Sequence, residues 1–178
     1  SVTIADDDTA VVTLAADTNV AEGSSATITA TLSTISSQDV TVTLVYTDVT
    51  ADGTDYTTST VEIVIPAGST TGTATVVTTG DSIDELDESF QVGISSVTNA
   101  SDGSTPQSVT ITDDDTSSVS ISASSSVDEG SNATITATLS VSNSQDVTVT
   151  LVFNYVDASS GDILTTTQEI VIPAGSLS

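Results

Sequence analysis

Carboxylates are the only charged side chains of this chain, and they are the groups best suited to chemistry. Its 178 residues include 25 Asp and Glu and no Lys, Arg or His, so the formal net charge is −25. Self-repulsion of this size disfavours the compact state unless cations from outside offset it. Clustered carboxylates suit Ca²⁺, which takes about six to eight oxygen ligands, whereas Mg²⁺ demands strict octahedral geometry. Transition metals would recruit His or Cys, and the chain has neither.

The same composition excludes several classes of function. Binding of nucleic acid rests on Lys and Arg and attachment to anionic membranes needs basic segments, so we expect neither partner. The absence of Cys rules out a fold stapled by disulfides. Catalysis would have to use a pair of carboxylates, and because a metal site already accounts for the acids, we expect no enzyme. Disorder is disfavoured, because 37% of the residues are hydrophobic and they alternate with polar residues.

The sequence repeats itself at a constant spacing of 107 residues. SVTIADDD at 1–8 returns as SVTITDDD at 108–115, and VAEGSSATITATLS at 20–33 returns as VDEGSNATITATLS at 127–140. Solenoid repeats are about 20 to 50 residues long, so this longer period indicates whole domains, each with its own core. The phase predicts the last strand of a preceding repeat at 1–8, a complete repeat at 9–115, and the first part of another repeat at 116–178. No signal peptide or membrane span is recognised, and we expect any such segment to lie outside this stretch.

Alternating apolar and hydroxyl residues, chiefly Val and Thr, are typical of half-buried β-strands. Seven such strands fit in the complete repeat, at about 10–16, 26–33, 40–47, 59–65, 71–79, 89–97 and 107–112. No segment predicts a long helix. The sequence therefore predicts an all-β protein made of tandem immunoglobulin-like antiparallel β-sandwich domains, with about seven strands each.

The acids of the complete repeat fall in four segments that this topology brings together. If successive strands alternate in direction, the loops after the first, third and fifth strands share one end with the residues after the seventh. Thirteen carboxylates lie in these segments: Asp17, Glu22, Asp48, Asp52, Asp55, Asp81, Asp84, Glu85, Asp87, Glu88, Asp113, Asp114 and Asp115. Elsewhere the repeat holds only Asp39, Glu62 and Asp102. A calcium site explains this segregation better than solubility, because the other loops are expected to be equally exposed and hold few acids.

The motifs resemble those of the Calx-β family, sandwich repeats known from sodium–calcium exchangers, an integrin β subunit and large bacterial surface proteins. The resemblance rests on AEGSSATITATLS from Ala21, DGTDY from Asp52, IPAGSTTGTATV from Ile65, GDSIDELDESF from Gly80 and VTITDDD from Val109. It implies that Ca²⁺ is held by Glu22, Asp55, Asp81, Glu85, Glu88, Asp113, Asp114 and Asp115. The family often has two adjacent Asp where this chain has Gly80-Asp81, so we expect one ligand to be missing, with Asp84 or Asp87 as a partial replacement.

The truncated repeat keeps two counterparts of these ligands, Glu129 and Asp162, and stops before the last three strands. Such a repeat has open strand edges, so it must borrow strands from a neighbour or remain unstable unless the natural chain continues, which is what we expect. At the other end, Asp6, Asp7 and Asp8 belong by phase to the site of the preceding repeat.

The repeats and their acids predict a structural role. The terminal acidic run is followed by only three residues before the next strand, so bound Ca²⁺ is expected to stiffen the junction between repeats. We expect an extracellular spacer in a bacterial adhesin or surface filament, because millimolar extracellular calcium suits weak acidic sites. Its expected partners are neighbouring repeats of the same chain and identical chains in a filament, without direct membrane contact. The alternative is a calcium-sensing regulatory module, which would need a bistable element that the sequence does not reveal.

Overall fold

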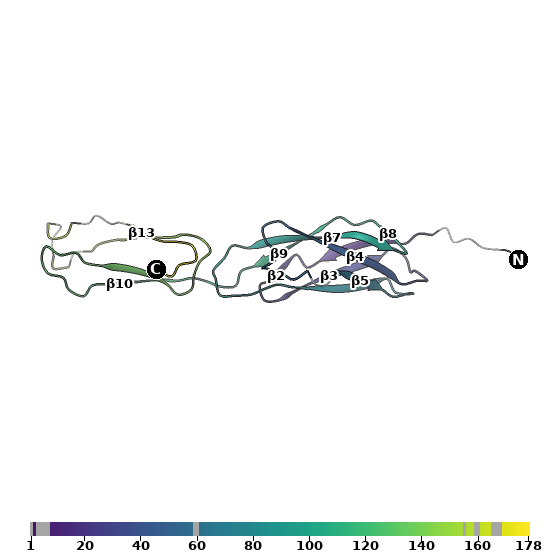
Figure 1. The fold of residues 1–178 in the computed structure, drawn as a ribbon, viewed down its shortest axis with the longest axis horizontal. Coiled ribbons are helices and arrows are strands. Elements are labelled where there is room, and N and C mark those ends of the chain that lie inside the picture. Colours follow the sequence, from purple (N-terminus) through teal and green to yellow (C-terminus); the bar gives the residue numbers. More distant parts are fainter. Residues whose placement is uncertain (1, 3–7, 59–60, 155, 159–160, 165–168) are drawn as a thin grey trace. The chain divides into compact units, whose positions relative to one another are not determined.

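The computed structural model describes residues 2, 8–58, 61–154, 156–158, 161–164 and 169–178 (Figure 1). The chain divides into two compact units, each described here by itself. The first runs to Asp81 and resumes at Asp87–Asp113, and the second comprises Ser82–Leu86 and Asp114–Ser178. Within the described residues, no helix has the length and apolar character needed to cross a membrane. Asp6, Asp7 and the predicted strand start at Ser59 lie outside the described residues.

The first unit is a sandwich of two β-sheets (Figure 1). One sheet has the order β6-β3-β1-β8, and the other has the order β2-β9-β7-β4-β5. The strands are β1 (Val11–Ala16), β2 (Asn19–Ala21), β3 (Ser25–Leu32), β4 (Val40–Asp48), β5 (Glu62–Ile65), β6 (Thr71–Val77), β7 (Glu88–Thr98), β8 (Ser101–Asp102) and β9 (Gln107–Thr112). All strand pairs in this unit are antiparallel except β1 with β8 and β2 with β9, which are parallel.

Alternation along the strands builds the core between the two sheets. On β3, for example, Ala26, Ile28, Ala30 and Leu32 are buried while Thr27 and Thr31 face outward. Each fully buried aliphatic side chain contributes about 1.5–3 kcal/mol relative to an exposed one. The buried cluster draws on both sheets and also contains Tyr56 and Phe90, whose rings stack with centroids 4.0 Å apart. The predicted all-β, immunoglobulin-like sandwich is thus confirmed.

Each of the seven predicted strands is present, with ends that shift by a few residues. The prediction missed β2 and β8, which have three and two residues. Strands this short carry no alternating pattern, because a period of two needs about four residues to be recognised. Both form parallel pairs along strands already in the sheets.

The strand register shows which loops share an end of the first unit. The following pairs lie at that end: Ala16 with Ile28, Ser25 with Val77, Asp48 with Phe90, Glu88 with Ile111, and Ala21 with Thr112. The loop between β1 and β3, the loop after β4, the residues on either side of the Ser82–Leu86 segment, and the residues after β9 therefore leave the sheets at one end. The predicted convergence of acidic segments follows from this register.

The second unit contains two two-stranded sheets, β10 (Val119–Ala123) with β11 (Ile135–Leu139) and β12 (Val147–Thr150) with β13 (Glu169–Ile172). At the repeat spacing of 107, these strands correspond to β1, β3, β4 and β5. The buried core is small and consists of Ala137, Leu139 and Ile172. Ile121 is 55% exposed, whereas its counterpart Leu14 is 8% exposed. Among the described residues, the second unit has no counterparts of β6, β7 and β9.

Candidate metal site

The parallel pairing of β2 with β9 sets two acidic residues side by side. Ala21 is in register with Thr112, and the N–H of Glu22 donates to the carbonyl oxygen of Thr112 over 3.0 Å. Glu22 and Asp113 are the next residues along the two strands. Because the strands are parallel, both residues leave the sheet at the same end and in the same direction.

Three carboxylates meet there: Glu22, Asp113 and Asp115. Each offers an oxygen, and the three oxygens lie within 4.8 Å of one another. All three residues are half-buried. Carboxylates this close repel unless one takes up a proton or a cation binds between them. The arrangement offers oxygen atoms only, which is the donor chemistry of a hard divalent cation.

A close approach of two loops brings Asp81 to this group. Gly80 lies against Gly23, and a Cβ atom placed on Gly80 would be 2.9 Å from both Cα and N of Gly23. The approach lets the N–H of Asp81 donate to Oε1 of Glu22 over 3.4 Å. An Asp at position 80, as the family often has, would collide with the backbone of Gly23 in this geometry. The absence of a side chain at Gly80 therefore permits the close packing of the two loops.

Thr78 fixes the loop that carries Glu22. Its hydroxyl group is buried and donates toward the carbonyl oxygens of Ala21 and Ser24 at 3.0 and 3.1 Å. It also accepts from the N–H of Ser24 over 3.0 Å. These contacts tie the residues on both sides of Glu22 to the end of β6. The role of Thr78 is not predictable from the sequence, because one more Thr in a Thr-rich stretch gives no signal.

Two further predicted ligands lie beside the terminal acidic run without joining the three-carboxylate group. Glu88 is the first residue of β7 and pairs with Ile111 of β9. Asp87, expected as a partial replacement, accepts a hydrogen bond from the N–H of Asp113 over 3.2 Å. Asp87 thereby supports the backbone at Asp113, one of the three acids.

Asp55 closes its own turn. Its Oδ2 accepts from the N–H of Asp52 over 2.6 Å, and Oδ1 of Asp52 accepts from the N–H and the hydroxyl of Thr54, both over 2.7 Å. The hydrogen bonds from Thr54 lower the pKa of the Asp52 carboxyl group, so it stays ionised. Among the described residues, Asp55 is not part of the three-carboxylate group.

Among the described residues, the remaining predicted ligands are not part of that group either. Glu85 is in the Ser82–Leu86 segment, and Asp114 is exposed directly after the first unit ends. Glu129 and Asp162 are also exposed. Asp84, expected as a partial replacement, bonds to Ser117 and Asn143 of the second unit instead.

Comparisons with known proteins agree with the fold. No family model matches the sequence, and no curated protein matches it. Among solved structures, the apo-form Calx CBD1 domain is 19% identical with a TM-score of 0.51, covering 58% of this chain and 98% of that one. CBD12 from CALX1.2 is 16% identical with a TM-score of 0.51, covering 93% of this chain and 73% of that one. At these identities the likeness concerns the fold, which is Calx-β-like as the motifs predicted.

Proposed function

We propose that this Calx-β-like chain is a calcium-binding structural repeat whose central ligands are Glu22, Asp113 and Asp115. The observation that supports it most directly is the meeting of three carboxylate oxygens within 4.8 Å in a chain with no side-chain cation. Neither an ion pair with Lys or Arg nor a His or Cys ligand is available to these acids. A hard cation from solution neutralises their charge and takes their oxygen atoms as ligands.

The residues present fit Ca²⁺ in their donor chemistry. The three acids supply oxygen ligands, and the geometry of Ca²⁺ sites is flexible enough to accept waters for the rest. When bound, the ion supplies the positive charge that the sequence lacks. Glu22 holds the β2 side of the site, Asp113 holds the β9 side, and the hydrogen bond from Asp81 orients the Glu22 carboxylate.

We place this repeat in an extracellular array, as a spacer of a bacterial adhesin or surface filament. Two features support that role. The repeat unit recurs at 107 residues, and the run Asp113–Asp115 is separated from β10 of the next repeat by only Thr116–Ser118. An ion held by this run acts on the residues that connect the repeats, so its binding restricts the connection. The partners of such a spacer are adjoining repeats and identical chains, and its function needs no catalytic residue.

Calorimetric titration tests calcium binding directly. Ca²⁺ is titrated into the chain after metal has been removed with a chelator, and Mg²⁺ is titrated in parallel. We expect saturable binding of Ca²⁺ that weakens at least about tenfold in Glu22→Gln. Glu62→Gln is the matched control, since Glu62 lies exposed on β5 and away from the acidic end. Equal affinity in Glu22→Gln and the unsubstituted chain would contradict the proposed site.

The spacer role has its own test. Small-angle X-ray scattering of the chain in Ca²⁺, and in Mg²⁺ at the same concentration, separates specific stiffening from simple charge screening. The spacer role predicts a narrower distribution of the chain's overall dimensions in Ca²⁺ than in Mg²⁺. It also predicts that the hydrogen-exchange protection of the β-sheets is the same in both ions. A sensor predicts a change in strand protection on binding, since it must switch a bistable element. Identical scattering in the two ions would argue against stiffening at the junction.

A further inference from the structure

The segment Ser82–Leu86 is not part of the sandwich formed by the rest of the first repeat. It lies in sequence between β6 and β7 of the first unit, yet its contacts place it in the second unit. Asp84 forms an isolated parallel bridge with Asn143. The N–H of Asp84 donates to the carbonyl oxygen of Ser142 over 3.0 Å, and the N–H of Ser144 donates to the carbonyl oxygen of Asp84 over 2.9 Å. This segment therefore pairs with the 142–144 turn as a short strand does.

The side chain of Asp84 adds a second set of contacts. Its Oδ2 accepts from the N–H and the hydroxyl of Ser117 over 2.8 and 2.5 Å, and from Nδ2 of Asn143 over 2.9 Å. The hydrogen bonds from Ser117, more than that from Asn143, hold the pKa of the Asp84 carboxyl group below its usual value. Hydrogen bonds to an ionised acceptor are stronger than those between neutral groups. Asp84 is thus held by its backbone and its carboxylate at once.

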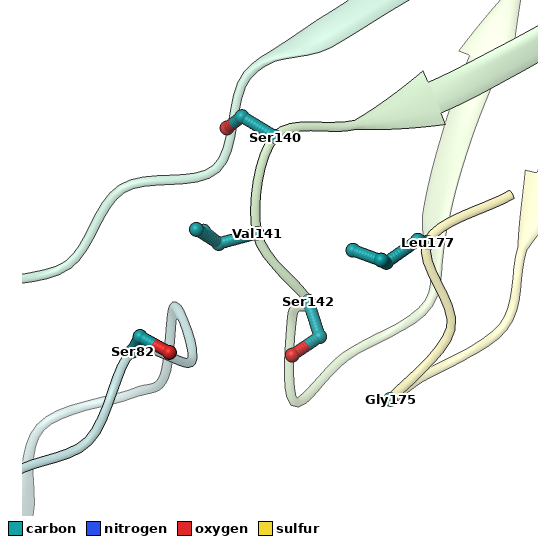
Figure 2. A pocket seen from close by; sticks show the side chains of 6 residues that line it. All are labelled: Ser82, Ser140, Val141, Ser142, Gly175 and Leu177. Atoms are coloured by element: carbon teal, nitrogen blue, oxygen red, sulfur yellow. The ribbon is translucent and has the colours of Figure 1, made fainter.

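The receiving turn is itself oriented for this contact. Oδ1 of Asn143 accepts from the N–H of Gln145 over 2.8 Å, which leaves Nδ2 to donate to Asp84. The carbonyl oxygen of Asn143 accepts from the N–H of Gly175 over 2.8 Å. Beside the turn is an open hollow of about 350 Å³. Figure 2 shows the side chains of Ser82, Val141 and Leu177 among those that line it.

We propose that the 82–86 segment is a docking element by which one repeat is fastened to the next, with Ser117 and Asn143 as its receptor. The proposal rests on the structural role argued above and specifies which residues join the repeats. It assigns Asp84 to the junction rather than to calcium. The partner it fits is a following repeat that presents hydrogen-bond donors at these two positions.

The first repeat has different residues at the two receptor positions. At the spacing of 107, Ala10 stands where the second repeat has Ser117, and Ser36 stands where it has Asn143. Ser36 keeps the local turn, because its Oγ accepts from the N–H of Gln38 as Oδ1 of Asn143 does from Gln145. It offers no amide group, and Ala10 offers no hydroxyl. The first repeat therefore lacks the side-chain donors that hold Asp84 in the second unit.

Hydrogen exchange of the full chain, measured by NMR in the presence of chelator, tests the docking. The reporter is the N–H of Ser144, because it bonds to the backbone of Asp84 and does not touch the carboxylate. In Asp84→Ala we expect its exchange to accelerate by roughly tenfold or more. The same acceleration is expected when the receptor is given the first repeat's residues, Ser117→Ala with Asn143→Ser. Asp102→Ala, which removes one charge from the β8 region, should leave Ser144 unchanged.

Two results would overturn the docking proposal. One is unchanged protection of Ser144 in both the Asp84 and the receptor variants. The other is an equal loss of protection in β10 and β11, which would show that the substitutions unfold the unit rather than release the segment. Since the measurement contains no calcium, a failure of the calcium site leaves these outcomes readable. Conversely, intact Ca²⁺ binding in Asp84→Ala would agree with the assignment of Asp84 to the junction.

Discussion

Gly80 packs so closely against Gly23 that a Cβ atom on Gly80 would lie 2.9 Å from the Gly23 backbone, and beside this contact the N–H of Asp81 donates to Oε1 of Glu22. Gly23 also adopts a positive φ of 66°, which glycine tolerates better than other residues. Its counterpart in the next repeat, Gly130, has a φ of 84°. Gly23 and Gly80 therefore act on the candidate metal site through backbone geometry, although neither has a ligand side chain.

Substitution of Gly80 by Ala should destabilise the first unit. The added Cβ would lie 2.9 Å from the backbone of Gly23, so a loop must move, at a cost of roughly 1–3 kcal/mol. The free energy of unfolding, measured with urea in chelator, checks this. Gly53→Ala is the control, because a Cβ there meets nothing within 4 Å and the residue lies in another acidic loop. Similar stabilities of the two variants would refute the role given to the Gly23–Gly80 contact.

Thr78→Val should destabilise the same loop without changing side-chain volume. The substitution removes the hydroxyl that bonds to Ala21 and Ser24 in a site that is 2% exposed. Loss of buried hydrogen bonds costs about 1–3 kcal/mol. Thr75→Val, three residues earlier and on the exposed face of β6, provides the control. Urea unfolding should separate the two variants, and a Thr78→Val chain as stable as Thr75→Val would contradict the anchoring role.

Ionisation of Tyr56 should make the first unit less stable at high pH. Its hydroxyl donates to Oδ1 of Asp48 over 2.6 Å, and burial followed by this hydrogen bond raises the pKa of Tyr56 well above its usual value. The unfolded chain ionises near pH 10, so Tyr56 contributes its full stabilisation below about pH 10. Above that pH the contribution falls, by up to about 1.4 kcal/mol per pH unit.

The matching variant for this pH dependence is Tyr56→Phe. We expect it to lose about 1 kcal/mol at neutral pH, because the hydrogen bond to Asp48 is absent. Between about pH 9 and 11.5 its unfolding free energy should fall less steeply than that of the unsubstituted chain. A residual slope is expected from Tyr46, whose pKa burial also raises. Parallel curves for the two chains would show that Tyr56 does not titrate as the structure implies.

The sandwich was predictable because apolar and polar residues alternate clearly along its strands, and because the same pattern recurs in the second copy of the repeat. On β3, and on β4 from Val40 to Leu44, the apolar positions of the sequence are the buried positions of the structure. The meeting of acidic loops followed from strand direction alone. The short strand β2 was not predicted from the sequence, although its pairing with β9 places Glu22 next to Asp113.

The individual ligands were harder to predict than the acidic end as a whole. Sequence position does not reveal that Asp55 closes a turn or that Asp87 supports the backbone of Asp113. The contacts of Asp84 were the hardest to predict from the sequence, because its partners Ser117 and Asn143 lie in the second unit. A reading of one repeat by itself treats its loop as part of that repeat, so contacts made with another stretch of chain remain hidden.

Thermal unfolding of the chain in millimolar Ca²⁺ and in chelator tests the central claim most directly. A cation that binds only the folded state at about 100 times its dissociation constant adds roughly 2.7 kcal/mol, so the transition should rise by several degrees in Ca²⁺. The variant Glu22→Gln with Asp113→Asn should lose this rise, whereas Glu62→Gln with Asp102→Asn, which removes as much charge elsewhere, should keep it. A rise of equal size in both variants, or none in the unsubstituted chain, would contradict calcium binding by Glu22, Asp113 and Asp115.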